Sequence, residues 1–451
     1  MGLNLPIQSR RIRYLVVVLP HLGFLATWNL GAHLPITLLW FATAVGALCW
    51  ASRWRPVPSL HLVLLIAAGL RLLALPLPPT LSGDVFRYIW DGKVAGAGFN
   101  PYELSPDAPE LAGLRDDLWR KLPHREVATV YPPLALTLFS IAAKFPWPIL
   151  SWKLILIAAD LTTCVFLFKL AALGKGDGGA VVWYAWNPLV TLEIAGMGHV
   201  DGLGVCAVVV TVWALVAGRK TTMIALSAAA GVLAKLVPLV AYPIWLRHSR
   251  RRWLFTGVSA LVFAAAFGPV VAASGGIPGG YLRFGTSWEF NGPLYEPLWR
   301  GLESAGSRGV VERALDRRKV GSGDHEFWNR WYPYNYSRMH ARLLLAVVLL
   351  VLLALAWRHS DVIAATGSVF EAVLLCSATV YPWYLLWLLP FAALRGHAAW
   401  LVLCCTAFIA YIPQFTEIPL MPWIFLACWG PYAAMTLMTL MGKPGRRWFA
   451  R

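Results

Sequence analysis

Long apolar runs recur along this chain from residue 13 to residue 441 and are interrupted mainly in two places. A helix of ~20 apolar residues crosses the bilayer core, so such runs indicate membrane spans. Only 14% of the residues are charged and 58% are hydrophobic, whereas soluble proteins carry roughly 25% charged residues. The runs alternate too weakly for an outer-membrane barrel. The sequence therefore predicts an all-α polytopic membrane protein, with a single integral-membrane domain over residues 1–451.

Several of the apolar stretches are shorter than the ~20 residues that a straight crossing needs, so broken or tilted helices are expected. The stretch 221–246 is predicted to be a hairpin with Lys235 near its turn, and 131–148 a re-entrant half-helix. This interpretation gives about 12–14 transmembrane helices. The candidate spans are 13–30, 33–51, 59–78, 150–172, 180–197, 199–217, 221–246, 253–273, 341–357, 361–379, 382–394, 398–412 and 420–440.

Short basic loops indicate the orientation of the chain. Arg10, Arg11 and Arg13 place the N-terminus in the cytoplasm, because cytoplasmic loops are enriched in Lys and Arg. Three spans later the chain reaches the outer face for a long loop at 79–130, and a second long loop at 274–340 is expected on the same side. Much of the formal charge of +17 serves as such orientation signals, so no nucleic acid is expected as a partner.

Motifs for soluble cofactors are missing from the sequence. The seven cysteines all fall within apolar runs and show no metal-site spacing. There is no Walker A loop, no strand-borne GxGxxG, no HExxH and no GxSxG. Without a nucleotide-binding domain, an enzyme working at the outer face would have to take an activated substrate from the bilayer.

The segment 82–93 follows the third span and reads Ser-Gly-Asp-Val-Phe-Arg-Tyr-Ile-Trp-Asp-Gly-Lys. Charges at the mouth of a span are costly unless they face water or a partner, so they suggest function. Asp84 is the candidate general base, and the alternative is a carboxylate that caps the following helix. If the segment is helical, Asp84, Arg87 and Asp91 share one face. A structural salt bridge is favoured over a catalytic role for Arg87.

Two further polar positions interrupt apolar runs. His199 and Asp201 lie in Gly-Met-Gly-His-Val-Asp-Gly and could bind phosphate, polarise an acceptor or hold a metal, the alternative being a polar turn. Lys235 lies inside an apolar run, where a lysine is expensive and usually paired. Contact with a lipid phosphate is favoured for Lys235, and snorkelling to the interface is the alternative.

The second long loop carries aromatic residues interleaved with Glu289 and Asn291, a composition that suits sugar recognition or an interfacial aromatic belt. Arg338, His340 and Arg342 just precede the next span. They are candidates for a phosphate clamp, because arginine recognises phosphate oxygens in a bidentate way, and interfacial anchoring is the alternative.

Taken in order, these motifs resemble a known family. The acidic motif of the first outer loop, then GFNPYE, TVYPPLALTLF, WNPL…GHVDGL and GVLAKLVPL, are similar to the integral-membrane glycosyltransferases of the C-type (GT-C) fold. The resemblance covers roughly residues 59–395 and is greatest to bacterial mannosyltransferases that use polyprenol-phosphate-mannose. It implies an inverting transfer of a hexose, with mannose favoured, from a polyprenyl-phosphate donor to a lipid or glycan acceptor. It also implies the bacterial inner (plasma) membrane, with the active site on the periplasmic or extracellular side.

The resemblance assigns the catalytic carboxylate to Asp84. It assigns the donor-phosphate contact to Lys235, together with either His199 or the group of Arg338, His340 and Arg342. Paired acids in many relatives suggest a divalent cation such as Mg or Mn. Here the pair would be Asp84 and Asp91, seven residues apart rather than adjacent, so metal dependence is left open and no metal ligand is assigned. A lipid-linked glycan ligase or polymerase and a lipid or sugar transporter (flippase) are the alternative functions.

Overall fold

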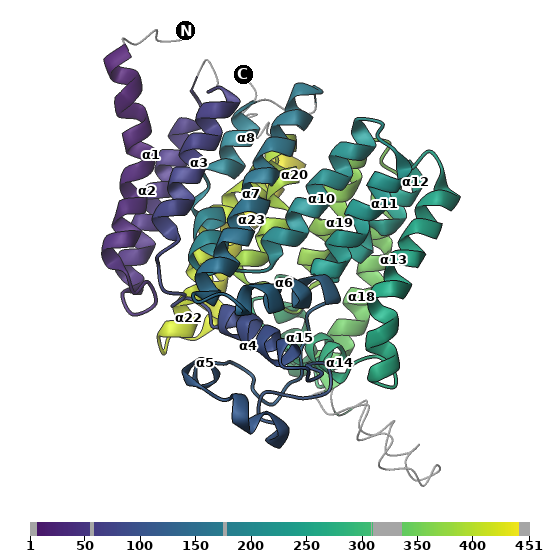
Figure 1. Ribbon diagram of the computed structural model, residues 1–451. Coiled ribbons are helices and arrows are strands. Elements are labelled where there is room, and N and C mark those ends of the chain that lie inside the picture. The colour runs from purple at the N-terminus through teal and green to yellow at the C-terminus, as the bar shows by residue number, and fades with distance from the viewer. Residues whose placement is uncertain (1–6, 55–57, 175–177, 308, 310–335, 442–451) are drawn as a thin grey trace. The chain divides into compact units, whose positions relative to one another are not determined.

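The computed structural model describes residues 7–54, 58–174, 178–307, 309 and 336–441 (Figure 1). The regular secondary structure within them is helical, apart from isolated bridges that join Phe290 and Asn291 to Thr379. Six helices are long and apolar enough to cross a membrane, and six shorter apolar helices accompany them. The predicted all-α polytopic membrane protein is confirmed.

The chain divides into two compact units, which are described separately. The first unit is Met1–Ser287 with Pro382–Arg451, and the second is Trp288–Tyr381. The prediction of one integral-membrane domain stays a prediction. Part of the predicted second outer loop, residues 308 and 310–335, lies outside the described residues.

The first unit begins with three packed helices, α1 (Ile7–Thr27), α2 (Leu34–Ala51) and α3 (Leu60–Ala74). They alternate in direction, and the chain then reaches α4 (Asp84–Gly96) at the end of the unit opposite to the start of α1 (Figure 1). This alternation agrees with the predicted path from a cytoplasmic N-terminus to an outer loop.

The first predicted outer loop is an ordered layer. It holds α4, the 3-10 helix η1 (Pro109–Leu114) and α5 (Asp117–Arg120). Trp90 and Val94 of α4 pack with Leu111 and Leu122 in a small hydrophobic core of their own. Apolar burial of this kind explains why this loop is ordered.

Helix breaks shape the middle of the first unit. α6 (Pro133–Ala143) has 11 residues, too few to cross a bilayer at 1.5 Å per residue, and is followed by α7 (Pro148–Ala172). The predicted span 180–197 is divided into α8 (Gly178–Ala185), α9 (Pro188–Val190) and the π-helix η2 (Thr191–Gly196). Pro188 cannot continue a helix, and the Asn187 side chain accepts from the Leu189 N–H to start the next turn.

The chain then runs through α10 (Asp201–Val216) and α11 (Thr221–Ala234). Lys235 has extended backbone angles and ends α11, after which η3 (Val237–Ala241) and α12 (Tyr242–His248) turn back and pack against α11 and α10. Lys235 therefore lies at the turn of the predicted hairpin. α13 (Arg252–Ala273) and α14 (Gly279–Ser287) follow, and Tyr281 of α14 donates to the carbonyl of Tyr131 beside the first loop.

The last part of the first unit consists of short, irregular helices. The π-helix η6 precedes the final long helix, α23. The elements are η4 (Pro382–Trp387), α20 (Leu389–Arg395), α21 (Ala398–Thr406), η5 (Ala407–Tyr411), α22 (Ile412–Phe415), η6 (Leu420–Ile424) and α23 (Phe425–Leu440).

The second unit contains α15 (Tyr295–Ser304), α18 (Tyr336–Trp357) and α19 (Val362–Cys376). Tyr295 of α15 packs with Ala341 and Leu345 of α18 in a buried cluster. α18 is otherwise largely exposed and apolar, as expected of a helix that faces lipid.

Candidate active site

Asp84 is the first residue of α4, and 34% of its side-chain surface is exposed. The N-cap of this helix is Gly83, and it makes no side-chain capping bond. A carboxylate in the first turn is favoured by the positive end of the helix dipole. The position agrees with that of a base open to a substrate.

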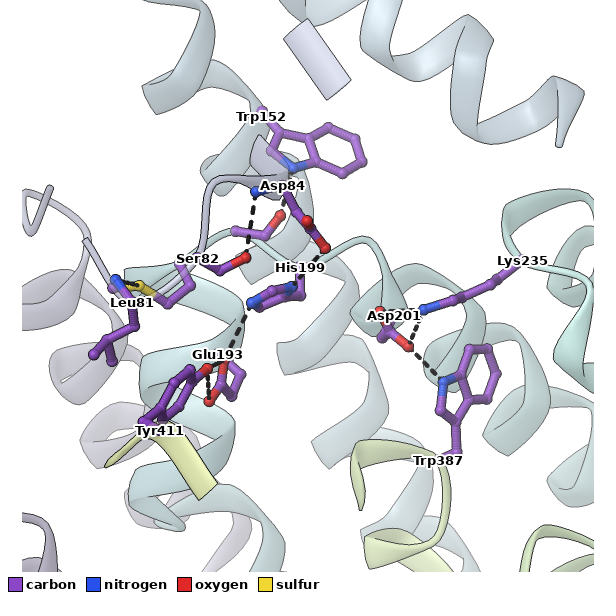
Figure 2. A network of polar contacts seen from close by, with 12 residues as sticks. Leu81, Ser82, Asp84, Trp152, Glu193, His199, Asp201, Lys235, Trp387 and Tyr411 are labelled. Atoms are coloured by element: carbon purple, nitrogen blue, oxygen red, sulfur yellow. Dashed lines mark hydrogen bonds and ion pairs between the residues drawn. The ribbon is translucent and has the colours of Figure 1, made fainter. Parts of the chain in front are cut away.

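His199 lies between two carboxylates, as Figure 2 shows. Its Nε2 is 3.2 Å from Oε2 of Glu193, and its Nδ1 is 3.9 Å from Oδ2 of Asp84. The second distance is too long for a direct hydrogen bond. His199 and Glu193 have no exposed side-chain surface, and Glu193 also accepts from the Tyr411 hydroxyl at 2.9 Å. The buried pair therefore lies behind Asp84 without a direct hydrogen bond to it.

The local backbone explains how this pair forms. Glu193 lies on the π-helix η2, and such helices occur often at functional sites. Gly198 then adopts a φ of +81°, which other residues rarely adopt, and its carbonyl accepts from the Trp152 indole at 2.8 Å. The ring of His199 is stacked on Trp383 with centroids 3.9 Å apart. The imidazole is thus fixed in position and orientation.

Aromatic side chains surround the start of α4. The rings of Tyr88 and Tyr131 meet edge to face, with centroids 4.9 Å apart. Burial, and then the charge of Asp84, raises the pKa of Tyr131 well above its usual value. This phenol remains protonated and neutral beside the carboxylate.

Arg87 forms the salt bridge that its spacing favoured, and its predicted contact with substrate stays a prediction. Its Nε donates to Oδ1 of Asp91 at 2.7 Å, and its other nitrogens donate to the carbonyls of His124 and Val127 at 3.1 and 2.6 Å. Asp91 is 2% exposed. The pair fastens α4 to the end of the first loop and leaves Asp84 outside the ion pair.

Asp201 and Lys235 form a second polar group, to the right of His199 in Figure 2. Nζ of Lys235 is 2.7 and 2.8 Å from the two oxygens of Asp201, and the Trp387 indole donates to the same carboxylate at 2.6 Å. Asp201 is fully buried, whereas 18% of the Lys235 side chain is exposed. The expectation that this lysine is paired is met, and its charge is largely balanced.

The remaining predicted residues lie in the second unit. Glu289 accepts from Arg338 at 2.7 Å and from Arg342 at 3.0 Å, and the Tyr295 hydroxyl donates to it as well. Asn291 is 2% exposed and has a positive φ of 55°, while His340 is half-buried on α18. The two arginines are brought together on one carboxylate, and the substrate contacts proposed for these five residues stay predictions.

The site contains residues that the sequence reasoning missed. Glu193 stood within a predicted span, and an acid at membrane depth is itself a signal of function. The indole of Trp387 and the hydroxyl of Tyr411 had no such signal, because aromatic residues are common throughout the chain. Their contacts depend on the fold of the last 70 residues of the first unit.

The donor set near Asp84 does not fit a divalent cation. The expected partner, Asp91, is engaged by Arg87, and His199 faces Glu193. Within the described residues no group of three or more His, Cys, Asp or Glu side chains is arranged to hold a metal ion. Magnesium or manganese would need several oxygen ligands around one point.

The sequence of this chain is similar to those of known mannosyltransferases. The family model described as "Alpha-(1->6)-mannopyranosyltransferase, N-terminal domain" matches residues 10–249, which is more than half of the chain. Alpha-(1->6)-mannopyranosyltransferase A of Mycobacterium tuberculosis is 27% identical over 404 residues, covering 82% of this chain and 72% of that protein. No solved structure matches the chain. The family match includes Asp84, Glu193, His199, Asp201 and Lys235, whereas the second unit lies outside it.

Proposed function

Because this chain belongs to the alpha-(1->6)-mannopyranosyltransferase family, we propose that it transfers mannose from a polyprenyl-phosphate donor to a hydroxyl of a lipid or glycan acceptor. The resemblance to membrane mannosyltransferases is confirmed by this membership, and the chain is a multi-pass membrane glycosyltransferase. The donor, the inversion, the alpha-(1->6) linkage, the outer-face location and the side-chain roles are the proposed parts.

The observation that carries the proposal is the placement of Asp84, partly exposed at the start of α4 with the buried His199–Glu193 pair behind it. Asp84 would take the proton of the acceptor hydroxyl while that oxygen bonds to the anomeric carbon. The bond from this carbon to the donor phosphate oxygen breaks, and the electron pair leaves with the polyprenyl phosphate. Attack opposite the leaving group inverts the centre, so an alpha product requires a beta-linked donor.

The neighbouring residues would position the reacting groups and balance the charge of the donor phosphate. Glu193 lies 3.2 Å from His199 and would hold its imidazole behind Asp84, which alone takes the proton. Lys235 remains a proposed donor-phosphate contact, although Asp201 balances much of its charge. Arg87 and Asp91 hold α4 in place. The transfer is proposed to need no metal, because the local carboxylates have other partners.

The path of the chain supports the proposed location. Three alternating helices separate the basic N-terminus from α4, which supports an outer-face site. A donor held in the membrane then meets the catalyst in one plane, which reduces the cost of bringing the reactants together.

A reconstituted assay tests the function. The purified protein in liposomes is given either polyprenyl-phosphate-mannose or GDP-mannose, together with a membrane lipid extract from the source cells as acceptor. We expect mannosylated product only from the lipid donor, with an alpha-(1->6) linkage by NMR. Transfer from the nucleotide sugar alone, or lipid movement across the bilayer without sugar transfer, would contradict the proposal.

A further inference from the structure

A groove of about 380 Å³ opens in the first unit between the link from α3 to α4 and the turn from α6 to α7. We call it the proline groove, and it is formed by residues 75–79, residues 146–150 and Lys153. Five of these eleven residues are prolines, and the others apart from Lys153 are Leu, Ile and Trp. Such walls suit an apolar chain, since proline has no backbone N–H to leave unsatisfied.

Lys153 is the cation of this groove and is 2% exposed. Its Nζ donates to the carbonyls of Leu77 at 2.7 Å and Leu75 at 3.3 Å. Among the described residues no carboxylate pairs with it. Lys235 and Arg71 differ, because each contacts an aspartate at 2.7 Å. A buried charge without a counter-charge is costly, and one N–H of this ammonium remains for a further acceptor. The groove is therefore suited to an anion.

The proline groove adjoins the candidate active site. A Cβ placed on Gly198 would lie 3.6 Å from Cγ of Lys153, and one on Gly196 would lie 3.9 Å from Cδ1 of Leu77. The indole of Trp152, which is next to Lys153, donates a hydrogen bond to the Gly198 carbonyl. His199 is the next residue. The segment 196–198 thus separates the groove from the buried pair that lies behind Asp84.

We propose that the proline groove binds the polyprenyl phosphate carrier, with its phosphate at Lys153 and its first isoprenoid units along the proline walls. This inference rests on the proposed function and assigns the carrier its place. Ligand pockets span about 300–1,000 Å³, so the groove holds the head and the start of the chain while the rest stays in the bilayer. An anionic bulk phospholipid also carries a charged phosphodiester but has no reason to lie beside the reacting centre.

The location gives Lys153 a role in the reaction. When the anomeric carbon leaves the phosphate oxygen, the carrier changes from a phosphodiester to a phosphomonoester and gains negative charge. An ammonium placed there would stabilise this charge as it develops. Lys153 would supply the positive charge beside the leaving phosphate, because Asp201 already balances the charge of Lys235.

Binding of a fluorescent polyprenyl phosphate to the full-length protein in phosphatidylcholine nanodiscs tests the proposal. We expect Lys153→Met to weaken binding about tenfold or more, as for loss of a hydrogen bond to a charged group. Lys153→Arg should retain part of the affinity. Ile149→Trp should also weaken binding, since it fills the groove without changing its charge. Lys144→Met is the matched control, because Lys144 is exposed and does not line the groove.

Wild-type affinity in both Lys153→Met and Ile149→Trp would overturn the proposal, and so would equal competition by phosphatidylglycerol, which would indicate a general phospholipid site. If Lys153→Met does not fold, Lys153→Arg and Ile149→Trp decide the question. The binding assay contains no sugar. Carrier binding through Lys153 without mannosyl transfer would refute only the proposed function, and transfer with unchanged carrier binding in the variants would refute only the groove.

Discussion

Nε2 of His199 lies 3.2 Å from the carboxylate of Glu193, and neither side chain has exposed surface. Nδ1 of the same ring lies 3.9 Å from Asp84, whose side chain is partly exposed. A buried acid that fixes an imidazole behind an accessible carboxylate is the relationship on which the proposed mechanism depends. It connects the π-helix η2 to the start of α4, more than 100 residues earlier in the chain.

Glu193→Gln should lower kcat on the order of 10- to 100-fold, as loss of a supporting partner does at metal sites, with little change in KM. The amide keeps the size of the side chain and removes its charge, so His199 loses its orienting partner. Steady-state mannosyl transfer over a range of pH measures this. Glu110→Gln in the exposed part of the first loop is the control. A kcat and a pH profile identical to those of wild type would show that Glu193 is only structural.

The Asp201–Lys235 pair should respond strongly to loss of one partner. Asp201→Asn or Lys235→Met alone leaves the other side chain without its charged partner. For a fully buried pair, such a change lowers the free energy of unfolding by about 3–5 kcal/mol. The double variant should be more stable than the sum of the two single effects predicts. Thermal unfolding in detergent measures all three. Additive effects would contradict the pairing. The exposed pair Lys93–Asp116 is the control, and its interaction should contribute about 1 kcal/mol or less to the free energy of unfolding.

Chelation should leave the activity unchanged. The carboxylates nearest the start of α4 are engaged by Arg87 and His199, so EDTA treatment followed by addition of Mg²⁺ or Mn²⁺ should not alter the rate. The assay uses protein purified in EDTA and checked for bound metals by mass spectrometry. Loss of activity that only a divalent cation restores would contradict the proposal that the transfer needs no metal.

Cysteine labelling tests the side of the membrane. Glu103 and Thr222 are both exposed, the first in the first loop and the second at the start of α11. An impermeant maleimide should label Glu103→Cys in intact spheroplasts, and Thr222→Cys only after permeabilisation. The reverse pattern would place Asp84 in the cytoplasm. The native protein provides the background from its own cysteines, which lie in apolar runs.

The periodicity and charge of the sequence predicted the membrane class of this protein and some of its ion pairs. The membrane class and the salt bridge of Arg87 followed from apolar length and from spacing along one helix face. The pairing of Lys235 followed from the cost of a charge in an apolar run, but its partner, Asp201, could not be read from the sequence. That partner depends on how α11 turns back beside α10.

The parts that were missed depend on contacts between distant segments. Glu193 carried a signal, since an acid lies within a predicted span, whereas Tyr411 reaches it from 218 residues away. Lys153 lies near the start of an ordinary apolar run, and its lack of a carboxylate is visible only once the helices are packed. Breaks such as Asn187-Pro188 were expected in general terms, and the π-helix that follows them was not.

The role of Asp84 as the base is the central claim, and mannosyl transfer by Asp84→Asn tests it most directly. The variant should insert, remain monodisperse and bind polyprenyl phosphate like wild type, while its transfer rate falls about 10²- to 10⁴-fold. Asp84→Glu should recover part of the rate. A transfer rate within a few-fold of wild type for Asp84→Asn would contradict the account.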